Sequence, residues 1–273
     1  MENKLTKRLK LDKLNFISEV IEYMKRIVLC DHGDLTKTSK LCTENNLGVN
    51  VDGFCMPDSY EKDANAINET IGAYKNTGIY SIHGPFCDLC FGSSDKLLRE
   101  VTRERFEHGY KISCALQCKN IILHNGYVPG TSFPQEWIKR GKVFWEDFLR
   151  NKDTETNFFI ENYLEKEPGI ILDLISAVNV NNFKMCLDIG HTNIHSKLHI
   201  TKWIEKSNEN IGFVHLHNNH GENDDHNGLN KGKINMNEVC RALEQYSPNA
   251  VWAIETTELE SSIKWLKENG YIR

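Results

Sequence analysis

Short apolar runs alternate with longer amphipathic segments along most of the 273-residue chain, and this alternation constrains the fold more than any other feature. The runs have the length and the Val, Ile and Phe content of buried strands, and the segments between them carry apolar residues at helical spacing. We predict strands at Val49–Val51, Ile79–His83, Asn120–His124, Phe158–Glu161, Met185–Asp188, Phe213–His217 and Val251–Glu255. We predict helices at Lys37–Asn45, Asn65–Lys75, Asp95–Gln117, Gln135–Arg150, Gly169–Val178, Ile200–Lys206, Met236–Tyr246 and Leu259–Glu268.

The first sixty residues fit this alternation least well. A weaker strand candidate lies within Leu14–Ile21, Arg26–His32 fits either an extra strand or an insertion, and we expect about the first 35 residues to be irregular. Eight strands alternating with eight helices indicate an α/β fold, a single (β/α)8 TIM barrel spanning residues 1–273. An open, doubly wound sheet is the alternative, but no GxGxxG motif follows a predicted strand.

Composition narrows the class of protein further. Hydrophobic residues make up 40% of the chain and charged residues 26%, which is ordinary for a globular domain, and no apolar run reaches the roughly 20 residues of a membrane span. The net charge of −5 argues against a nucleic-acid partner held by bulk positive charge. Nine scattered cysteines and the lack of a secretory signal favour reduced thiols and a cytoplasmic location. The single CxxC pair, Cys87 and Cys90, is interpreted as packing residues.

Metal-ligand residue types occur where the predicted strands end. Six strands carry such a residue at or near the C-terminal end: His83, His124, Glu161, Asp188, His215 and Glu255. One charged residue after a strand is usually only its solvated end, but all strand C-termini of a barrel meet at one face. We therefore expect these side chains to lie together in one hollow at the C-terminal face of the barrel, which we call the cup. His191, three residues after Asp188, joins them, as do Asp224 and His226 from the loop after the predicted strand Phe213–His217.

Imidazoles and carboxylates without thiolates are typical of zinc, manganese or iron sites. Several carboxylates confined in one cup repel each other, and bound divalent cations are the usual way to neutralise them. We therefore predict a divalent-metal site at the C-terminal face of the barrel.

These segments resemble the xylose isomerase-like TIM-barrel superfamily, which holds sugar (phosphate) isomerases and epimerases and endonuclease IV-type nucleases acting at apurinic sites. The resemblance extends from about Ser81 to Glu255. Its most specific segments are His83-Gly-Pro-Phe86, Glu161-Asn, Leu187-Asp-Ile-Gly-His191-Thr-Asn, His215-Leu-His-Asn-Asn, Asp224-Asp-His226 and Gly232-Lys-Ile.

The resemblance implies a ligand set for one to three ions, with zinc or manganese expected first. The nuclease-type pattern is complete, with three groups: His83, His124 and Glu161; Glu161, Asp188, His215 and Glu255; and His191, Asp224 and His226. The sugar-isomerase branch commonly uses only the second group, around one ion.

Our first hypothesis is an isomerase or epimerase acting on a small sugar or sugar phosphate. Glu161 and Glu255 would exchange the proton as general base and acid, and His191 would bind a substrate hydroxyl. Candidate substrate contacts are Phe86, His217 and Lys231, with Trp137 and Lys233 as further candidates. The alternative for Trp137 is packing in the outer helix ring, and the alternative for the two lysines is a solvated loop.

The second hypothesis is a trinuclear zinc phosphoester hydrolase of the endonuclease IV type, which the complete set of nine ligands favours. Against a DNA-directed version, the predicted strand-end loops lack a basic and aromatic stripe. Against a plain ketose substrate, Asp224 and His226 replace an arginine that ketose epimerases of this superfamily often carry. A metal or ligand sensor without catalysis would need a closed coordination shell. We favour the first hypothesis.

Overall fold

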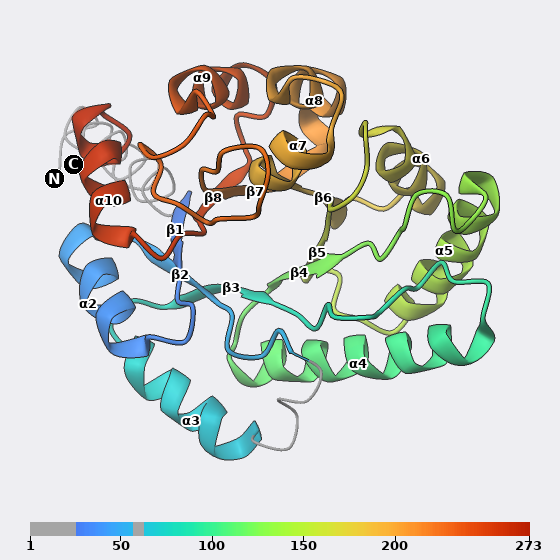
Figure 1. The fold of residues 1–273 in the computed structure, drawn as a ribbon. Coiled ribbons are helices and arrows are strands. Elements are labelled where there is room, and N and C mark those ends of the chain that lie inside the picture. Colours follow the sequence, from blue (N-terminus) through green and yellow to red (C-terminus); the bar gives the residue numbers. More distant parts are fainter. Residues whose placement is uncertain (1–25, 57–62) are drawn as a thin grey trace, which may run out of the picture.

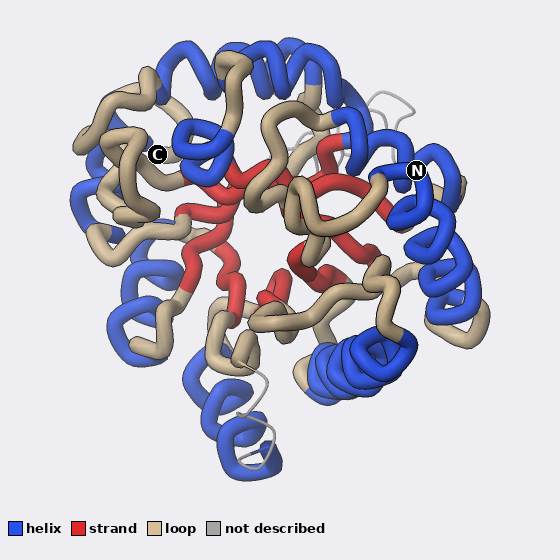
Figure 2. The backbone as a smooth tube through the Cα atoms, turned by 45° about the vertical axis from the view of Figure 1, so that its right-hand side comes forward, coloured by secondary structure: helices blue, strands red, loops and turns tan. Residues whose placement is uncertain are grey.

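Eight parallel strands close into a barrel in the computed structural model, which describes residues 26–56 and 63–273. The strands pair in chain order, and β8 pairs with β1 to complete the ring (Figure 2). Their bounds are β1 Ile27–Cys30, β2 Gly48–Val51, β3 Ile79–His83, β4 Asn120–His124, β5 Asn157–Glu161, β6 Phe183–Asp188, β7 Ile211–Leu216 and β8 Val251–Ile254. The prediction of a closed (β/α)8 barrel is confirmed.

An outer layer of helices surrounds this barrel (Figure 1). In the described ranges these are α2 Leu35–Asn45, α3 Asp63–Tyr74, α4 Lys96–Ala115, α5 Pro134–Leu149, α6 Gly169–Val178, α7 Ile189–His195, α8 Ile200–Ser207, α9 Met236–Tyr246 and α10 Leu259–Glu268, with a 3-10 turn η2 at Asn208–Asn210. The predicted helices are present within a few residues, and α7 is an addition. It begins directly after β6, where the Asp188 side chain accepts a hydrogen bond from the His191 backbone N–H and caps the helix.

The N-terminal prediction needs a correction. The first barrel strand is Ile27–Cys30, within the segment interpreted as an extra strand or insertion, so the irregular region does not extend to residue 35. This run of four apolar residues is fully buried, as expected for a strand covered on both faces. The other candidate, Leu14–Ile21, lies outside the described residues, and the barrel has its eight strands without it.

The barrel interior is apolar below the strand ends. Side chains alternate between the two faces of a strand, so residues two positions before a site residue point the same way, one layer lower. Phe159, Cys186 and Phe213 precede Glu161, Asp188 and His215 in this manner, and all three are buried. The interior cluster consists of Val28, Cys30, Ile122, Phe159, Cys186, Phe213, Val251 and Ala253. It forms a low-dielectric floor under the polar upper layer.

The space between barrel and helices is filled largely by aromatic rings near α4 and α5. Trp137 is fully buried and packs on Phe91 and Tyr127, with ring centroids 5.0 and 5.3 Å apart. Trp137 is therefore an outer-ring packing residue. Among the described helices, none is both long enough and apolar enough to span a membrane.

Trp145 provides a test of this packing. It is fully buried, and its ring lies 4.7 Å from that of Phe183 and 5.4 Å from that of Phe148. We expect Trp145→Ala to lower the free energy of unfolding by about 3–5 kcal/mol, because the truncated side chain leaves a cavity among rigid rings. Chemical denaturation measures this loss. Phe133→Ala, at a side chain that is 80% exposed, is the control and should change stability by less than about 0.5 kcal/mol. A loss below about 1 kcal/mol for Trp145→Ala would contradict this account.

Candidate metal centre

The barrel brings the predicted ligand residues to one end of the molecule. His83, His124, Glu161 and Asp188 are the last residues of β3, β4, β5 and β6. His215 is the penultimate residue of β7, Glu255 follows β8 directly, His191 lies in α7, and Asp224 and His226 come from the loop between β7 and α9. The register pairs His124 with Glu161 and Asp188 with His215 on adjacent strands. The cup expected from the sequence is therefore present as a spatial arrangement.

Glu161 lies at the centre of this arrangement. Its Oε2 atom is 3.3 Å from His83 Nε2 and 3.4 Å from His124 Nε2, and its Oε1 atom is 3.2 Å from His215 Nδ1. Burial opposes ionisation of this side chain, but His215 and His124 outweigh it and hold the pKa of Glu161 well below its ordinary value. Glu161 is thus a buried carboxylate that two neighbouring groups of ligands share.

Three carboxylates surround a single nitrogen of His215. Its Nδ1 atom lies 3.2 Å from Glu161 Oε1, 3.2 Å from Glu255 Oε2 and 3.7 Å from Asp188 Oδ2. One proton on this nitrogen cannot neutralise three buried carboxylates. Asp188, His215 and Glu255 thus lie close enough together to hold a divalent cation, and Glu161 Oε1 lies beside the same His215 nitrogen.

A third group forms around Asp224. Its Oδ2 atom is 3.2 Å from His191 Nε2 and 3.0 Å from His226 Nε2. The His217 ring stacks on His226, with centroids 4.1 Å apart, and its Nε2 atom is 3.2 Å from Asp188 Oδ2. His217 therefore connects the second and third groups.

Peptide oxygens define the orientation of three of these imidazoles. The Nδ1 atom of His83 lies 2.8 Å from the Gly84 oxygen, that of His191 lies 2.9 Å from the Asn162 oxygen, and that of His226 lies 3.1 Å from the Glu255 oxygen. A peptide oxygen only accepts hydrogen bonds, so each Nδ1 carries the proton, and in the neutral ring Nε2 presents a lone pair.

Each of these Nε2 atoms faces a carboxylate oxygen at 3.0 to 3.3 Å. A lone pair and a carboxylate repel unless a positive charge, either a second proton or a metal ion, lies between them. Histidine rings whose other nitrogen donates to a carbonyl are also the usual arrangement in metal sites. The residues present therefore fit divalent cations.

A cavity of about 830 Å³ opens over this centre, large enough for a small organic molecule. His83, His124, Glu161, His191, Asp224, His226 and Glu255 line its polar part, and Phe86, Leu89, Leu98, Tyr127, Val128, Tyr163 and Leu164 line its apolar part. Among the described residues, no lysine or arginine lines this cavity.

Three predicted substrate contacts thus take different places. Phe86 lines the cavity and packs on His124, with ring centroids 4.5 Å apart. His217 is fully buried against Asp188 and does not line the cavity. Lys231 also lies outside the cavity lining, and its ammonium group pairs with Glu258 at 2.7 Å. Lys233 does not line the cavity either, and both lysine side chains are exposed. The alternative of a solvated loop describes both lysines.

Sequence reasoning missed the contributions of β1 and β2. Asp31 directly follows β1, and Asp52 directly follows β2 and lines the cavity. Burial, followed by repulsion from Asp31 and Glu255, raises the pKa of Asp52 to about 7. The signal was the same as on the other strands, a carboxylate at the C-terminal end, but neither residue belongs to the ligand pattern of the resemblance.

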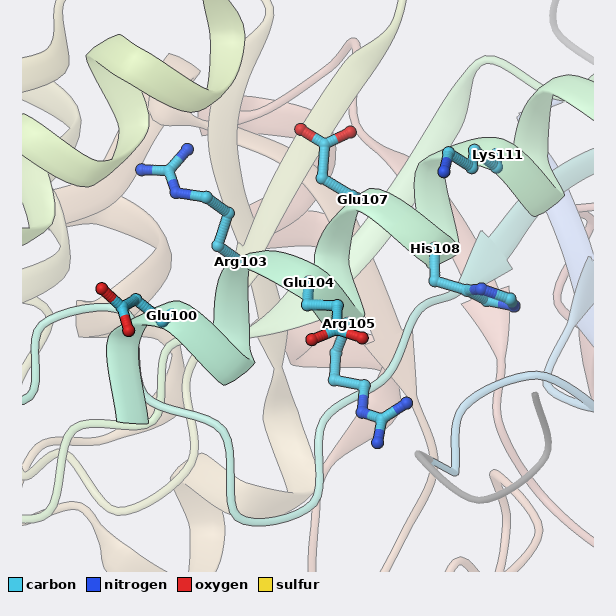
Figure 3. Close-up of a pocket in the computed structure, with 7 residues that line it drawn as sticks. All are labelled: Glu100, Arg103, Glu104, Arg105, Glu107, His108 and Lys111. Atoms are coloured by element: carbon cyan, nitrogen blue, oxygen red, sulfur yellow. The ribbon is translucent and has the colours of Figure 1, made fainter. Parts of the chain in front are cut away.

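Another hollow, on the outer surface of α4, differs in kind. Its lining, as far as the described residues go, comes from one helix and mixes acidic residues with Arg103, Arg105, His108 and Lys111, which project from successive turns (Figure 3). Side chains on the convex surface of one helix do not converge on a common point. The described lining of this hollow therefore has no arrangement suited to catalysis.

Gly190 is required by the packing of the centre. It lies between Asp188 and His191, and a Cβ atom there would overlap the His217 ring. We expect Gly190→Ala to lower metal affinity about 10- to 100-fold, because His217 has to leave its contact with Asp188. Competition with a chelator measures this change. Gly72→Ala, in α3 where an added Cβ meets nothing within 4 Å, is the matched control. Metal affinity within about twofold of the wild-type value for Gly190→Ala would show that the contact does not matter.

Comparison with known proteins places this geometry in a family. A family model described as xylose isomerase-like TIM barrel matches residues 43–269. The uncharacterised protein MJ1311 of Methanocaldococcus jannaschii is 25% identical over 196 residues, which are 67% of this chain and 66% of that protein. The match thus spans just under two thirds of the relative's own length.

Solved structures show the same fold, and sugar epimerases are among them. A D-tagatose 3-epimerase-like protein is 20% identical, with a TM-score of 0.72 over 90% of this chain and 96% of that chain. The TTHB071 protein from Thermus thermophilus, soaked with ZnCl2, is also 20% identical, with a TM-score of 0.69 and coverage of 89% and 96%. A D-psicose 3-epimerase in the presence of D-fructose is 18% identical, with a TM-score of 0.63 and coverage of 83% of each chain. Because the family model covers most of the sequence, this chain belongs to the xylose isomerase-like TIM barrel family.

Proposed function

We propose that this protein is a divalent-metal-dependent isomerase or epimerase that acts on a small sugar. The observation that carries the proposal is the convergence of Glu161 and Glu255 on His215 Nδ1, each at 3.2 Å. Both residues also line the cavity, so two carboxylates would face a molecule bound in it. The sugar epimerases among the solved neighbours support this substrate class.

The two carboxylates have complementary tasks in such a reaction. A divalent cation held by Glu161, Asp188, His215 and Glu255 would act as a Lewis acid that polarises the substrate carbonyl. One glutamate removes the proton from the carbon next to the carbonyl, and the other returns a proton to the opposite face or to the neighbouring carbon. His191, whose ring is oriented by the Asn162 oxygen, contacts a substrate hydroxyl, and Phe86 packs against the carbon skeleton.

The cavity lining favours an unphosphorylated sugar. Phosphate groups are usually bound by arginine, lysine or a helix N-terminus, and no lysine or arginine among the described residues lines the cavity. Carboxylates at Asp88 and Asp224 instead contribute negative charge to it. We therefore assign the substrate to the uncharged sugars rather than to the sugar phosphates.

Glu161→Gln tests the proton transfer. We expect it to lower the rate of deuterium incorporation from D2O into the sugar by about 10²–10⁴-fold, because an amide cannot act as the base. The assay uses the metal-loaded protein with D-tagatose, D-psicose, D-fructose and a panel of other unphosphorylated aldoses and ketoses, read by mass spectrometry. Glu268→Gln, at an exposed partner of Lys264 on α10, is the control and should match the wild type. Exchange by Glu161→Gln within about tenfold of wild type would rule out this role.

The group of His191, Asp224 and His226 favours a second candidate, a trinuclear zinc phosphoester hydrolase. A single-ion isomerase has no need for these three side chains as ligands, whereas a hydrolase of this kind would use them for a third ion. Ions held by the three ligand groups would supply the charge that activates the attacking water and stabilises the leaving oxygen.

Asp224→Ala separates the two candidates. The isomerase proposal predicts that this variant exchanges deuterium within about tenfold of the wild-type rate. Asp224 contacts His191 and His226, but the proton is transferred by Glu161 and Glu255. The hydrolase candidate predicts that elemental analysis falls from about three zinc ions to about two and that hydrolysis of bis(p-nitrophenyl) phosphate is abolished. Wild-type protein that hydrolyses this diester and exchanges no sugar proton would overturn the isomerase proposal.

A further inference from the structure

Asp52 lies on the side of the cup that the candidate metal ligands leave free. It follows β2, while the ligand residues come from β3 to β8 and the loops that follow them. In an eight-stranded ring, β2 is opposite β6, so Asp52 lies across the cavity from His191. It takes part in none of the groups of described residues that could hold a metal ion.

Neighbouring side chains hold Asp52 in one position. Its Oδ1 atom accepts a hydrogen bond from Asn50 Nδ2 at 2.5 Å, and its backbone N–H donates to Asp31 Oδ1 at 3.0 Å. Asp31 in turn accepts hydrogen bonds from the Tyr74 hydroxyl at 3.1 Å and from the Gly33 N–H at 3.2 Å. The ends of β1 and β2 are thereby connected, and Asp52 is pre-organised before any ligand binds.

The second oxygen of Asp52 keeps unused hydrogen-bonding capacity. Among residues 26–56 and 63–273, Oδ2 accepts only a long bond from the His32 N–H, at 3.4 Å, and the His32 ring nitrogen is 3.7 Å away. Its side chain is 12% exposed, and no lysine or arginine of the described chain pairs with it. A carboxyl group offers about four acceptor positions, so a rigid and nearly buried one at a cavity wall is a ready partner for hydroxyl groups.

We propose that Asp52 is a specificity-determining residue that binds a hydroxyl group of the sugar substrate. The inference rests on the proposed function and adds the residue that selects among hydroxylated substrates. A wall built to bind a hydroxyl discriminates strongly against an analogue that lacks it, because the buried polar group is then left unpaired. The residues at the ends of β3 to β8 catalyse the proton transfer, and Asp52 at the end of β2 recognises the substrate.

Asp52→Asn and Asp52→Ala, assayed as metal-loaded full chains, test this role. The substrate is the sugar with the highest kcat/KM in the deuterium-exchange panel, together with each of its monodeoxy analogues. We expect both variants to lower kcat/KM by about 10- to 100-fold, mainly through KM. Asp173→Asn, an exposed residue of α6, is the matched control and should leave kcat, KM and the deoxy profile unchanged.

The deoxy analogues distinguish recognition from a merely structural effect. One analogue lacks the hydroxyl group that Asp52 binds, and the wild type should already have a lowered kcat/KM for it. Asp52→Asn should lower kcat/KM for this analogue by less than about twofold more, since the partner hydroxyl is gone. Elemental analysis and the melting temperature of Asp52→Asn should match the wild type, because the residue is no ligand.

Three results would overturn the inference. Unchanged kcat/KM in both variants would show that Asp52 does not touch the substrate. An equal loss for every deoxy analogue, or a loss of bound metal, would show that Asp52 supports the fold or the centre instead. A wild-type protein that exchanges no sugar proton contradicts the proposed function itself, and the inference fails with it. If the wild type does exchange the proton and only the Asp52 variants give one of the results above, the proposed function stands and only the inference fails.

Discussion

The arrangement of this site depends on one electrostatic constraint: the imidazole nitrogens cannot turn away from the carboxylates they face. Peptide oxygens bind the Nδ1 atoms of His83, His191 and His226, so their Nε2 atoms point at Glu161 or Asp224. In a buried setting, this juxtaposition is stable only if a cation or an extra proton lies between the partners. The apolar floor of the barrel intensifies the constraint because it excludes water that could screen the charges. A divalent cation between the facing atoms of each group would satisfy these contacts.

The closed barrel divides the cup into two halves with different side chains. The ends of β3 to β8 supply histidines and carboxylates whose charges are mutually coupled, whereas the ends of β1 and β2 supply Asp31 and Asp52, which are tied to Asn50 and Tyr74. Under the proposed function, a sugar bound between these halves would meet the cation side of the cup on one face and hydrogen-bond acceptors on the other. The apolar wall around Phe86 and Tyr163 provides packing for the faces of the ring or chain.

The two chemistries considered for this protein share most of their machinery. Both use Glu161 and the donors around His215, and they differ in what the group of His191, Asp224 and His226 does. The cavity lining favours an uncharged ligand, because it offers carboxylates and no described lysine or arginine. The choice between isomerase and hydrolase is therefore a question about the third group, and Asp224 is the residue that decides it.

Local sequence determined the strands, most helices and the strand-end ligand residues, since an apolar run with a His, Asp or Glu after it is a property of a few neighbouring residues. Asp52 carries the same signal and was missed only because it lies outside the ligand pattern. The first strand was uncertain because Leu14–Ile21 competed with Arg26–His32 for its place. Tertiary structure alone decided which nitrogen of His191 and of His226 faces the centre, that Lys231 turns to Glu258, and that His217 is buried on Asp188. These depend on partners 27 and 29 positions away in the chain, and only the closure of the barrel brings those partners into contact.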